Sequence, residues 1–186
     1  MSDEVAVLLA PGFEEIEAVT VIDVLRRAGV EVTTVAVRER EVAGAHGITV
    51  VADTTLASAG ARGFGWLVLP GGLPGATTLR DDPQVQALVK AQHQRGGALA
   101  AICAAPIALA QAGVLQGRRV TSYPGFEPQL GDVRYQPHAV VDDGAIVTSR
   151  GVGTALAFAL ALVARLRGQA VADDLAARML VARERA

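Results

Sequence analysis

The sequence contains little cysteine and little histidine, and each shortage excludes a class of protein. Its one cysteine, Cys103, cannot form an intramolecular disulfide. Three histidines scattered along 186 residues do not have the ligand spacing of a zinc site. We therefore expect neither a disulfide staple nor a bound metal.

The chain also has no large excess of positive or negative charge and no long apolar run. The 17 basic and 19 acidic side chains give a net charge of −2, so no positive field attracts nucleic acid. The longest apolar run, residues 155–164, is ten residues long, about half of the ~20 that a membrane-spanning helix needs. The acidic amino terminus, residues 1–4, has no basic segment of the kind that begins a secretory signal. We expect a cytoplasmic protein that contacts neither membrane nor nucleic acid.

What the sequence does contain favours one α/β domain spanning residues 1–186. Hydrophobic residues make up 51% of the chain, enough to fill the core of a domain of this length. Apolar strand-like segments alternate with amphipathic helical ones, and Gly29 follows the first helical segment where a helix C-cap is expected. The expected strands are 5–10, 30–37, 48–52, 66–69, 98–102, 119–121, 139–141 and 145–148, the last two forming a hairpin; the expected helices are 14–28, 83–94, 105–112, 154–166 and 170–182.

This alternation predicts a three-layer sandwich, a largely parallel sheet with helices on both faces. In such sheets the ligand site lies beyond the carboxyl ends of the strands. Candidate functional residues are therefore those that directly follow a strand.

The clearest candidate is Cys103, in the segment 101–106 (AICAAP), where an apolar strand leads directly into a helix. Only small residues fit beside a nucleophile on so tight a turn, as in the Gly-x-Ser-x-Gly turn of hydrolases. The amino terminus of the following helix is expected to lower the pKa of the thiol. The alternative is a buried cysteine that only packs, which is common for a free cysteine in an apolar strand.

Two further segments follow strands. Residues 69–76 (LPGGLPGA) include Gly71 and Gly72, whose backbone N–H groups suit an oxyanion site. The alternative is a plain turn. A phosphate-binding Walker loop is excluded because no Gly-Lys-Ser/Thr follows. In residues 11–17 (PGFEEIE), helical periodicity directs Glu17 inward, whereas Glu14 and Glu15 fit a solvated first turn. Near Cys103, Glu17 would share one proton with the thiol.

The other candidates are weaker. Residues 148–154 (TSRGVGT) lack the third glycine of a dinucleotide fingerprint, so we interpret them as a packing turn. His46 and His138 are each either a general base or a surface residue. His93 is expected to be solvated.

Four segments, PGFEEIEA at 11–18, LPGG at 69–72, AICAAP at 101–106 and TSRGVGT at 148–154, together resemble the ThiJ/PfpI superfamily. The similarity is greatest to the branch that holds the bacterial YajL protein and the human parkinsonism-associated deglycase, and it spans nearly the whole chain. It implies a flavodoxin-like, class I glutamine amidotransferase-like domain that forms a homodimer. It also implies a reactive Cys103 beside a protonated Glu17, and an oxyanion site made by the N–H groups of Gly72 and Ala104.

The chain departs from the pattern at three places. Tyr123 stands where the human member has a histidine, so a Cys-His dyad is not expected. Ala104 stands where the protease-like members have a histidine, which removes the base of a cysteine protease. His46, in residues 45–47 (AHG), matches a dimer-facing loop, so it is a candidate to reach the partner subunit's site. Tyr123, His46 and Gly71 are candidate accessory residues.

Three hypotheses about function follow from the resemblance. The first is a cofactor-free glyoxalase III or deglycase, acting on methylglyoxal, glyoxal or their early glycation adducts through Cys103 and Glu17. The second is a redox-sensing stress-response protein or chaperone controlled by oxidation of Cys103. The third is a packing scaffold with a vestigial site.

Overall fold

The computed structural model describes residues 4–59 and 63–181. Two parts of the predictions lie outside the described residues: residues 1–3 of the acidic amino terminus, and residue 182 at the end of the last expected helix. The strands are β1 (Val5–Leu9), β2 (Val32–Ala36), β3 (Glu41–Ala43), β4 (Thr49–Val51), β5 (Thr54–Thr55), β6 (Trp66–Leu69), β7 (Ala98–Ile102), β8 (Arg119–Val120), β9 (Arg134–Tyr135), β10 (Val140–Asp142) and β11 (Ile146–Ser149). The helices are α1 (Glu15–Arg27), α2 (Leu56–Ala59), α3 (Gly75–Asp81), α4 (Pro83–Gln94), α5 (Pro106–Gln111), α6 (Ala155–Arg167) and α7 (Gln169–Arg178), with 3₁₀ turns at Glu127–Gln129 and Val152–Thr154.

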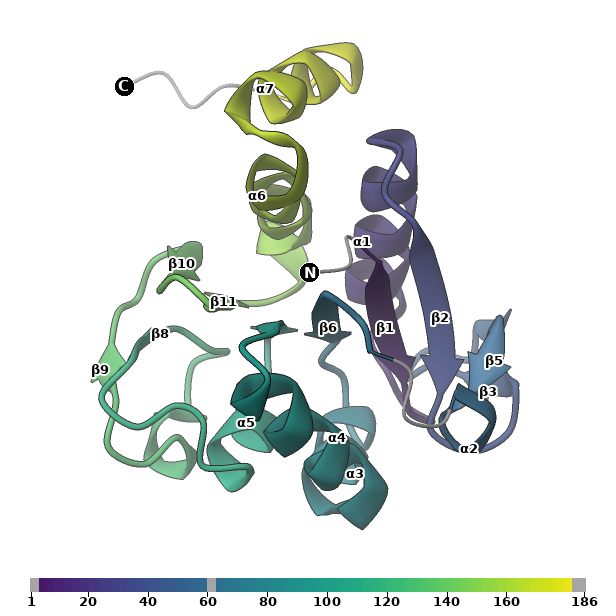
Figure 1. Ribbon diagram of the computed structural model, residues 1–186, viewed down its shortest axis with the longest axis vertical. Helices are drawn as coiled ribbons and strands as arrows, with labels where there is room; N and C mark the ends of the chain where they lie inside the picture. The colour runs from purple at the N-terminus through teal and green to yellow at the C-terminus, as the bar shows by residue number, and fades with distance from the viewer. Residues whose placement is uncertain (1–3, 60–62, 182–186) are drawn as a thin grey trace.

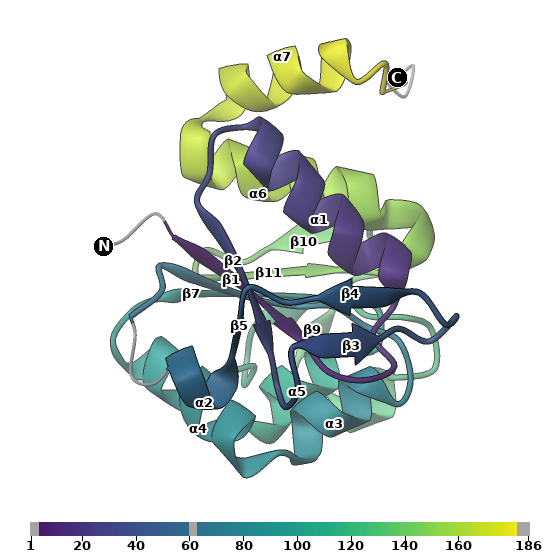
Figure 2. The same cartoon turned by 90° about the vertical axis from the view of Figure 1, so that its right-hand side faces the viewer.

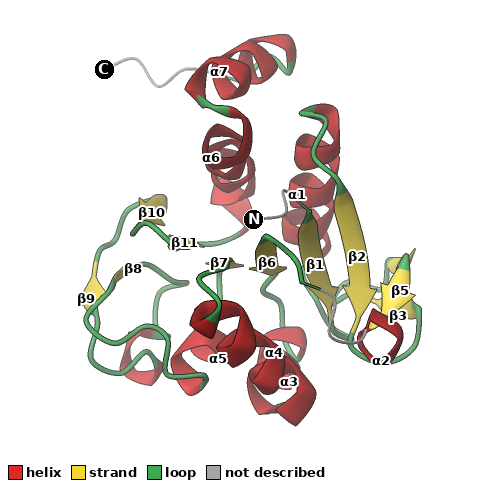
Figure 3. Ribbon diagram, in the orientation of Figure 1, coloured by secondary structure: helices red, strands yellow, loops and turns green. Residues whose placement is uncertain are grey.

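A seven-stranded sheet forms the middle layer, in the order β10-β11-β7-β6-β1-β2-β5. Its pairs are parallel except β10–β11, which form the expected hairpin. Helices α1, α6 and α7 lie on one side of the sheet and α2, α3, α4 and α5 on the other (Figures 1 and 3). The three-layer α/β fold expected from the sequence is confirmed.

The apolar sequences of the central strands explain why they lie inside. Every residue of β1 and β6 is buried, because helices cover both faces of a parallel sheet. Helix α1 ends as its sequence predicts: Gly29 has a φ of 69°, and the Val30 N–H donates to the Leu25 carbonyl over 3.0 Å. This is the Schellman end that a glycine after the last turn favours, and it turns the chain back into β2.

Some elements differ from the sequence prediction. The expected strand 48–52 is β4, which pairs with β3 in a separate two-stranded ribbon and does not join the main sheet. The expected strand 119–121 is β8, paired with β9 outside that sheet. Helix α3 was missed because its sequence, GATTLRD, begins with glycine and has two β-branched threonines, both of which disfavour a helix. Tertiary packing against α5 overrides these local preferences.

The described helices have 13 residues at most, and none combines the length and apolar character needed to span a bilayer.

Candidate active site

Cys103 lies on the turn between β7 and α5 with a backbone φ of 65°. This left-handed conformation costs a non-glycine residue about 1–2 kcal/mol, so the surrounding structure must impose it. Two hydrogen bonds do so: the Cys103 N–H donates to the Ser149 carbonyl over 3.0 Å, and the Cys103 carbonyl accepts from the Tyr123 N–H over 2.8 Å. Its neighbours Ala104 and Ala105 are buried, as the expected tight turn requires.

Glu17 is fully buried in the first turn of α1 and points toward this turn. Its Oε2 accepts a hydrogen bond of 2.8 Å from the Gly71 N–H, whereas its Oε1 is buried and accepts none. A Cβ at position 71 would lie 2.6 Å from the Cys103 Cβ and 2.7 Å from Glu17 Oε2. Only glycine therefore lets the acid and the thiol approach each other here.

The acid and the thiol titrate as a pair. Burial raises the pKa of Glu17 to about 7, and burial together with the negative charge of Glu17 raises the pKa of Cys103 to about 12. The expectation that a helix terminus lowers the thiol pKa is wrong. Helix α5 begins only at Pro106 and has six residues, so its dipole does not outweigh burial beside a carboxylate. Between the two pKa values the pair holds one proton, as the sequence predicts. The order of the two values places this proton on the Cys103 sulfur, whereas the sequence resemblance implies that it is on Glu17.

The backbone N–H groups of Gly72 and Ala104 both face the sulfur of Cys103, where they lower its pKa against the larger effect of burial. Gly72 has a φ of 86°, and a Cβ there would lie 2.3 Å from the Glu14 nitrogen. Glycine at this position therefore allows the loop after β6 to present its amide to the sulfur.

Figure 2 shows the β3–β4 ribbon beside the start of α1, and the Glu15 side chain joins the two. Glu15 Oε1 accepts from the N–H groups of His46 and Ile48 over 2.7 and 3.3 Å, and Oε2 lies 3.0 Å from His46 Nδ1. Burial alone would raise the pKa of Glu15, but hydrogen bonds from its own backbone N–H, from His46 and from Ile48 outweigh it and lower the pKa to about 2. The hydrogen bond to Glu15 in turn raises the pKa of His46. Glu15 is thus buried, not solvated as expected.

Among the described residues, the one group with metal-ligand atoms close together is Glu14, Glu15 and His46, within 4.8 Å of one another. Both oxygens of Glu15 and Nδ1 of His46 are already engaged in the hydrogen bonds that hold the ribbon. The group therefore serves as a clamp between α1 and the β3–β4 ribbon.

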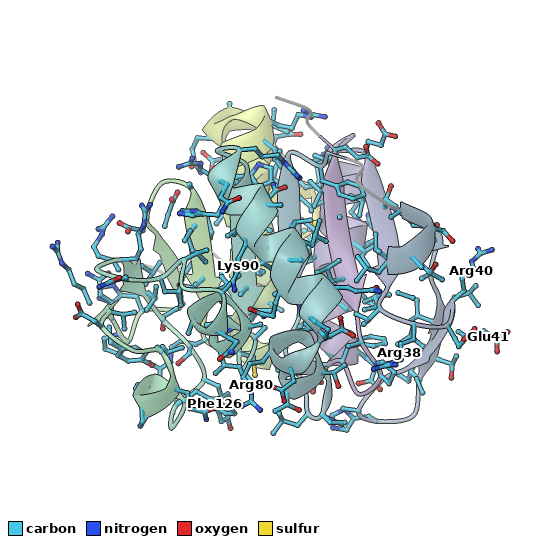
Figure 4. The ribbon with its side chains drawn as sticks, turned by 60° about the horizontal axis from the view of Figure 1, so that its bottom comes forward. Arg38, Arg40, Glu41, Arg80, Lys90 and Phe126 are labelled. Atoms are coloured by element: carbon cyan, nitrogen blue, oxygen red, sulfur yellow. The ribbon has the colours of Figure 1, made fainter. Side chains whose placement is uncertain are left out.

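Tyr123 and Phe126 lie on the loop between β8 and β9, and their rings meet edge to face with centroids 6.4 Å apart. Tyr123 is half exposed. Phe126 lies at the same end of the molecule as Arg38, which follows β2 (Figure 4). The loop thus reaches the edge of the sheet where Cys103 lies.

These residues surround one cavity of about 790 Å³. Its lining combines Cys103, Gly72, the clamp residues Glu14, Glu15 and His46, and an apolar wall. The lining residues are Glu14, Glu15, Ile16, Ala45, His46, Ile48, Gly72, Leu73, Cys103, Ala104, Tyr123, Phe126 and Val152.

The cavity brings together most of the predicted site residues, with Glu17 and Gly71 buried behind its floor. His138 is exposed and His93 lies at the end of α4; neither lines the cavity. The segment 148–154 does more than pack, because the Ser149 carbonyl holds Cys103 and Val152 lines the cavity.

Sequence reasoning missed the contributions of Phe126, Leu73 and Val152. Phe126 carried a usable signal: it lies three residues from Tyr123 in a chain with only four phenylalanines and two tyrosines.

A parallel α/β sheet with a cysteine on the turn after a central strand, beside a buried acid, defines a class of flavodoxin-like proteins. The model of the DJ-1/PfpI family matches residues 3–165. The chain belongs to the DJ-1/PfpI family.

Relatives and solved structures agree with this membership. The chain is 42% identical over 185 residues to protein dj-1beta of Drosophila melanogaster, and the match covers 98% of this chain and 99% of that one. The crystal structure of Drosophila melanogaster DJ-1beta superposes on this chain with a TM-score of 0.94, over 98% of this chain and 100% of the other. The oxidized DJ-1 of Toxoplasma gondii superposes with a TM-score of 0.93 at 37% identity, over 97% and 99% of the two chains. The glutathione-independent glyoxalase DJR-1.2 of Caenorhabditis elegans is 35% identical over 165 residues, or 87% of this chain and 88% of that one.

Proposed function

We propose that this protein is a cofactor-free glyoxalase that converts methylglyoxal to lactate and glyoxal to glycolate through Cys103 and Glu17. Its relatives, DJR-1.2 among them, support a glyoxalase-type, deglycase-type or stress-response role in general. The observation that carries the finer proposal is the pairing of buried Glu17 with partly exposed Cys103, which opens onto a cavity beside two backbone N–H groups.

The first step forms a bond between the sulfur of Cys103 and the aldehyde carbon. As it forms, the thiol proton passes to the carboxylate of Glu17, and the aldehyde oxygen, which becomes negative, accepts hydrogen bonds from the N–H groups of Gly72 and Ala104. Glu17 then returns the proton to that oxygen, giving a hemithioacetal. The raised pKa of Glu17, about 7, suits an acid that must take up and release a proton near neutral pH.

The second step is an internal oxidation and reduction that needs no external electron carrier. Glu17 removes the proton from the former aldehyde carbon, and the electron pair moves through an enediol so that the adjacent carbonyl carbon gains a proton. The aldehyde carbon is thereby oxidised to a thioester and the ketone carbon reduced to an alcohol. Water then cleaves the thioester, releasing lactate and restoring the thiol. Early glycation adducts, the hemiaminals and hemithioacetals that other amines and thiols form with the same aldehyde, would enter at the first step, where the Cys103 sulfur bonds to that carbon and the amine or thiol leaves with a proton.

A redox-sensing role is the second candidate, because the groups that face the sulfur would also hold an oxidised sulfur. When the shared proton is on Glu17, the sulfur is a thiolate, the form that peroxide oxidises. The N–H groups of Gly72 and Ala104 and the O–H of Glu17 could then donate hydrogen bonds to sulfinate oxygens.

Limiting peroxide is expected to add two oxygens to Cys103 before it oxidises Met179. Met179 is the matched control because it is partly exposed, as Cys103 is. Peptide mass spectrometry measures both. Oxidation of both residues at equal rates would rule out the sensor.

We also propose a homodimer. Four large apolar side chains on α1, on β4 and just before β4 are exposed by 45–61%: Ile16, Val19, Ile48 and Val51. A partner that covered this face would bury it, and His46, in the loop next to β4, would lie at the edge of the interface.

Sedimentation is expected to give about twice the 19.2 kDa chain mass at micromolar concentration. Replacing Ile48 and Val51 together by aspartate should give the monomer, since it places charges within the buried face. Val171→Asp, on the exposed part of α7, is the control that should stay dimeric. A wild-type protein that sediments as a 19.2 kDa species would refute the dimer.

A further inference from the structure

The cavity is larger than the smallest dicarbonyls require. In the single chain its volume of about 790 Å³ lies within the roughly 300–1,000 Å³ of sites that enclose drug-sized ligands. Of its 13 lining residues, Ile16 and Ile48 belong to the proposed dimer face. The aromatic residues Tyr123 and Phe126 and the acidic Glu14 do not. Methylglyoxal has three carbons, so most of the cavity would stay filled with water when it is bound. The part of the cavity beyond the sulfur therefore suits a substituent on the reactive carbonyl compound.

An aromatic wall stands next to the sulfur. The Tyr123 N–H is bonded to the Cys103 carbonyl, so the tyrosine is attached to the nucleophile's own backbone. A Cβ at position 151 would lie 3.2 Å from Cδ2 of the Tyr123 ring and 3.9 Å from the Cys103 sulfur. Because residue 151 is glycine, the space between ring and sulfur is open.

The wall continues along the loop and presents apolar surface. Phe126 meets Tyr123 at an interplanar angle of 79°, so the two rings form a corner. Leu73 and Val152, which also line the cavity, are 54% and 37% exposed. A ligand that covers this apolar surface is stabilised because it removes the surface from water, and a flat ring is stabilised further by packing edge to face or offset on Tyr123.

The charged side chains around the cavity are mostly acidic. Among the described residues no lysine or arginine lines it; the charged groups are the carboxylates of Glu14 and Glu15 and the imidazole of His46, which lies 3.6 Å from Glu14 and 3.0 Å from Glu15. Glu14 and Glu15 carry two negative charges, and His46 carries at most one positive charge. The rim of the cavity is therefore net negative whether or not His46 is protonated. An anionic substituent would be repelled here, and a neutral one would not.

We infer that the preferred substrates are neutral 2-oxoaldehydes with a flat apolar substituent, aryl glyoxals, whose ring packs in the corner of Tyr123 and Phe126 while the aldehyde reacts with Cys103. The inference rests on the proposed glyoxalase function and adds the substrate class. An aryl glyoxal undergoes the same rearrangement as methylglyoxal and gives a 2-aryl-2-hydroxy acid.

The test compares kcat/KM for methylglyoxal, phenylglyoxal and 4-carboxyphenylglyoxal without glutathione. Phenylglyoxal is expected to exceed methylglyoxal by about 10-fold or more, a size typical of added apolar contact. The carboxylated ring is expected to lose most of that gain, and Glu14→Gln or added salt should restore part of it. Tyr123→Ala should reduce the phenylglyoxal-to-methylglyoxal ratio about 10-fold, whereas Tyr123→Phe, which keeps the ring, should preserve it. Val171→Ala, on α7, is the control that leaves the ratio unchanged.

The outcomes separate the two proposals. Turnover of methylglyoxal with a ratio near one, or a ratio that Tyr123→Ala does not change, overturns the aryl preference and leaves the glyoxalase intact. No turnover of either substrate overturns the glyoxalase and, with it, this inference. A second readout needs no catalysis: neutral mandelamide should protect Cys103 from alkylation by iodoacetamide at lower concentration than lactamide does. Equal protection by the two amides contradicts the aromatic subsite.

Discussion

Replacing Cys103 by serine is expected to abolish glyoxalase turnover, with a loss of roughly 10³-fold or more in kcat/KM. A hydroxyl is a much weaker nucleophile than a thiol, and the Glu17 carboxylate, with a pKa of about 7, is too weak a base to activate it. Serine preserves the size of the side chain, so the turn between β7 and α5 should keep its conformation. Circular dichroism and a melting curve that match the wild type would establish this.

The mutant also controls for a side reaction of dicarbonyls with arginine. The chain has one lysine, Lys90, and its other basic side chains are arginines, which form stoichiometric adducts with methylglyoxal. Loss of substrate caused by those arginines would continue unchanged in Cys103→Ser. A serine variant that still forms lactate at most of the wild-type rate would disprove the role of Cys103.

The second large effect concerns Glu17 and pH. Glu17→Gln is expected to lower kcat/KM by about 10²–10⁴-fold, the usual contribution of a general acid–base group. In the wild type kcat/KM should rise with pH through about 7, because only the ionised carboxylate can take the proton of the thiol. Glutamine cannot titrate, so the residual activity of the variant should lack this rise. A rise through pH 7 that persists in Glu17→Gln would assign it to another group.

The same substitution should change how stability depends on pH. Glu17 binds its proton more tightly in the folded protein, with a pKa of about 7 against the usual 4.5. The stabilisation that results is complete below about pH 4.5 and is lost as the pH rises through 7. At roughly 1.4 kcal/mol per pKa unit, the wild type should lose about 3 kcal/mol relative to Glu17→Gln over that range. Chemical denaturation of both proteins at pH 5 and pH 8 measures the difference.

The fold could be predicted from the sequence because its central strands and main helices carry strong local signals. Short apolar runs such as β1 and β6 are typical of strands buried on both faces, and Gly29 marks the end of α1. The short elements could not be predicted, because their residues have weak or contrary preferences. The β3–β4 ribbon is held by Glu15, a contact between residues more than 30 positions apart that no local pattern encodes.

The candidate site was predictable to the extent that it follows strand ends. Cys103, Gly71 and Gly72 closely follow β7 or β6, and Glu17 lies in the first turn of the helix that follows β1; the parallel sheet brings those strand ends together. The thiol pKa was not predictable, because it depends first on how deeply the thiol itself is buried and then on the charge of Glu17 beside it. The apolar wall was missed because the loop between β8 and β9 returns to the site only in three dimensions.

The most direct test of the account is to follow methylglyoxal and lactate together by NMR, with catalytic amounts of wild-type protein and no glutathione. Each methylglyoxal consumed should yield one lactate over many turnovers, and alkylation of Cys103, the chain's one cysteine, should stop lactate formation in proportion to the fraction modified. Loss of methylglyoxal without lactate, ending after a few equivalents per chain, would show trapping by arginine and would contradict the proposed enzyme.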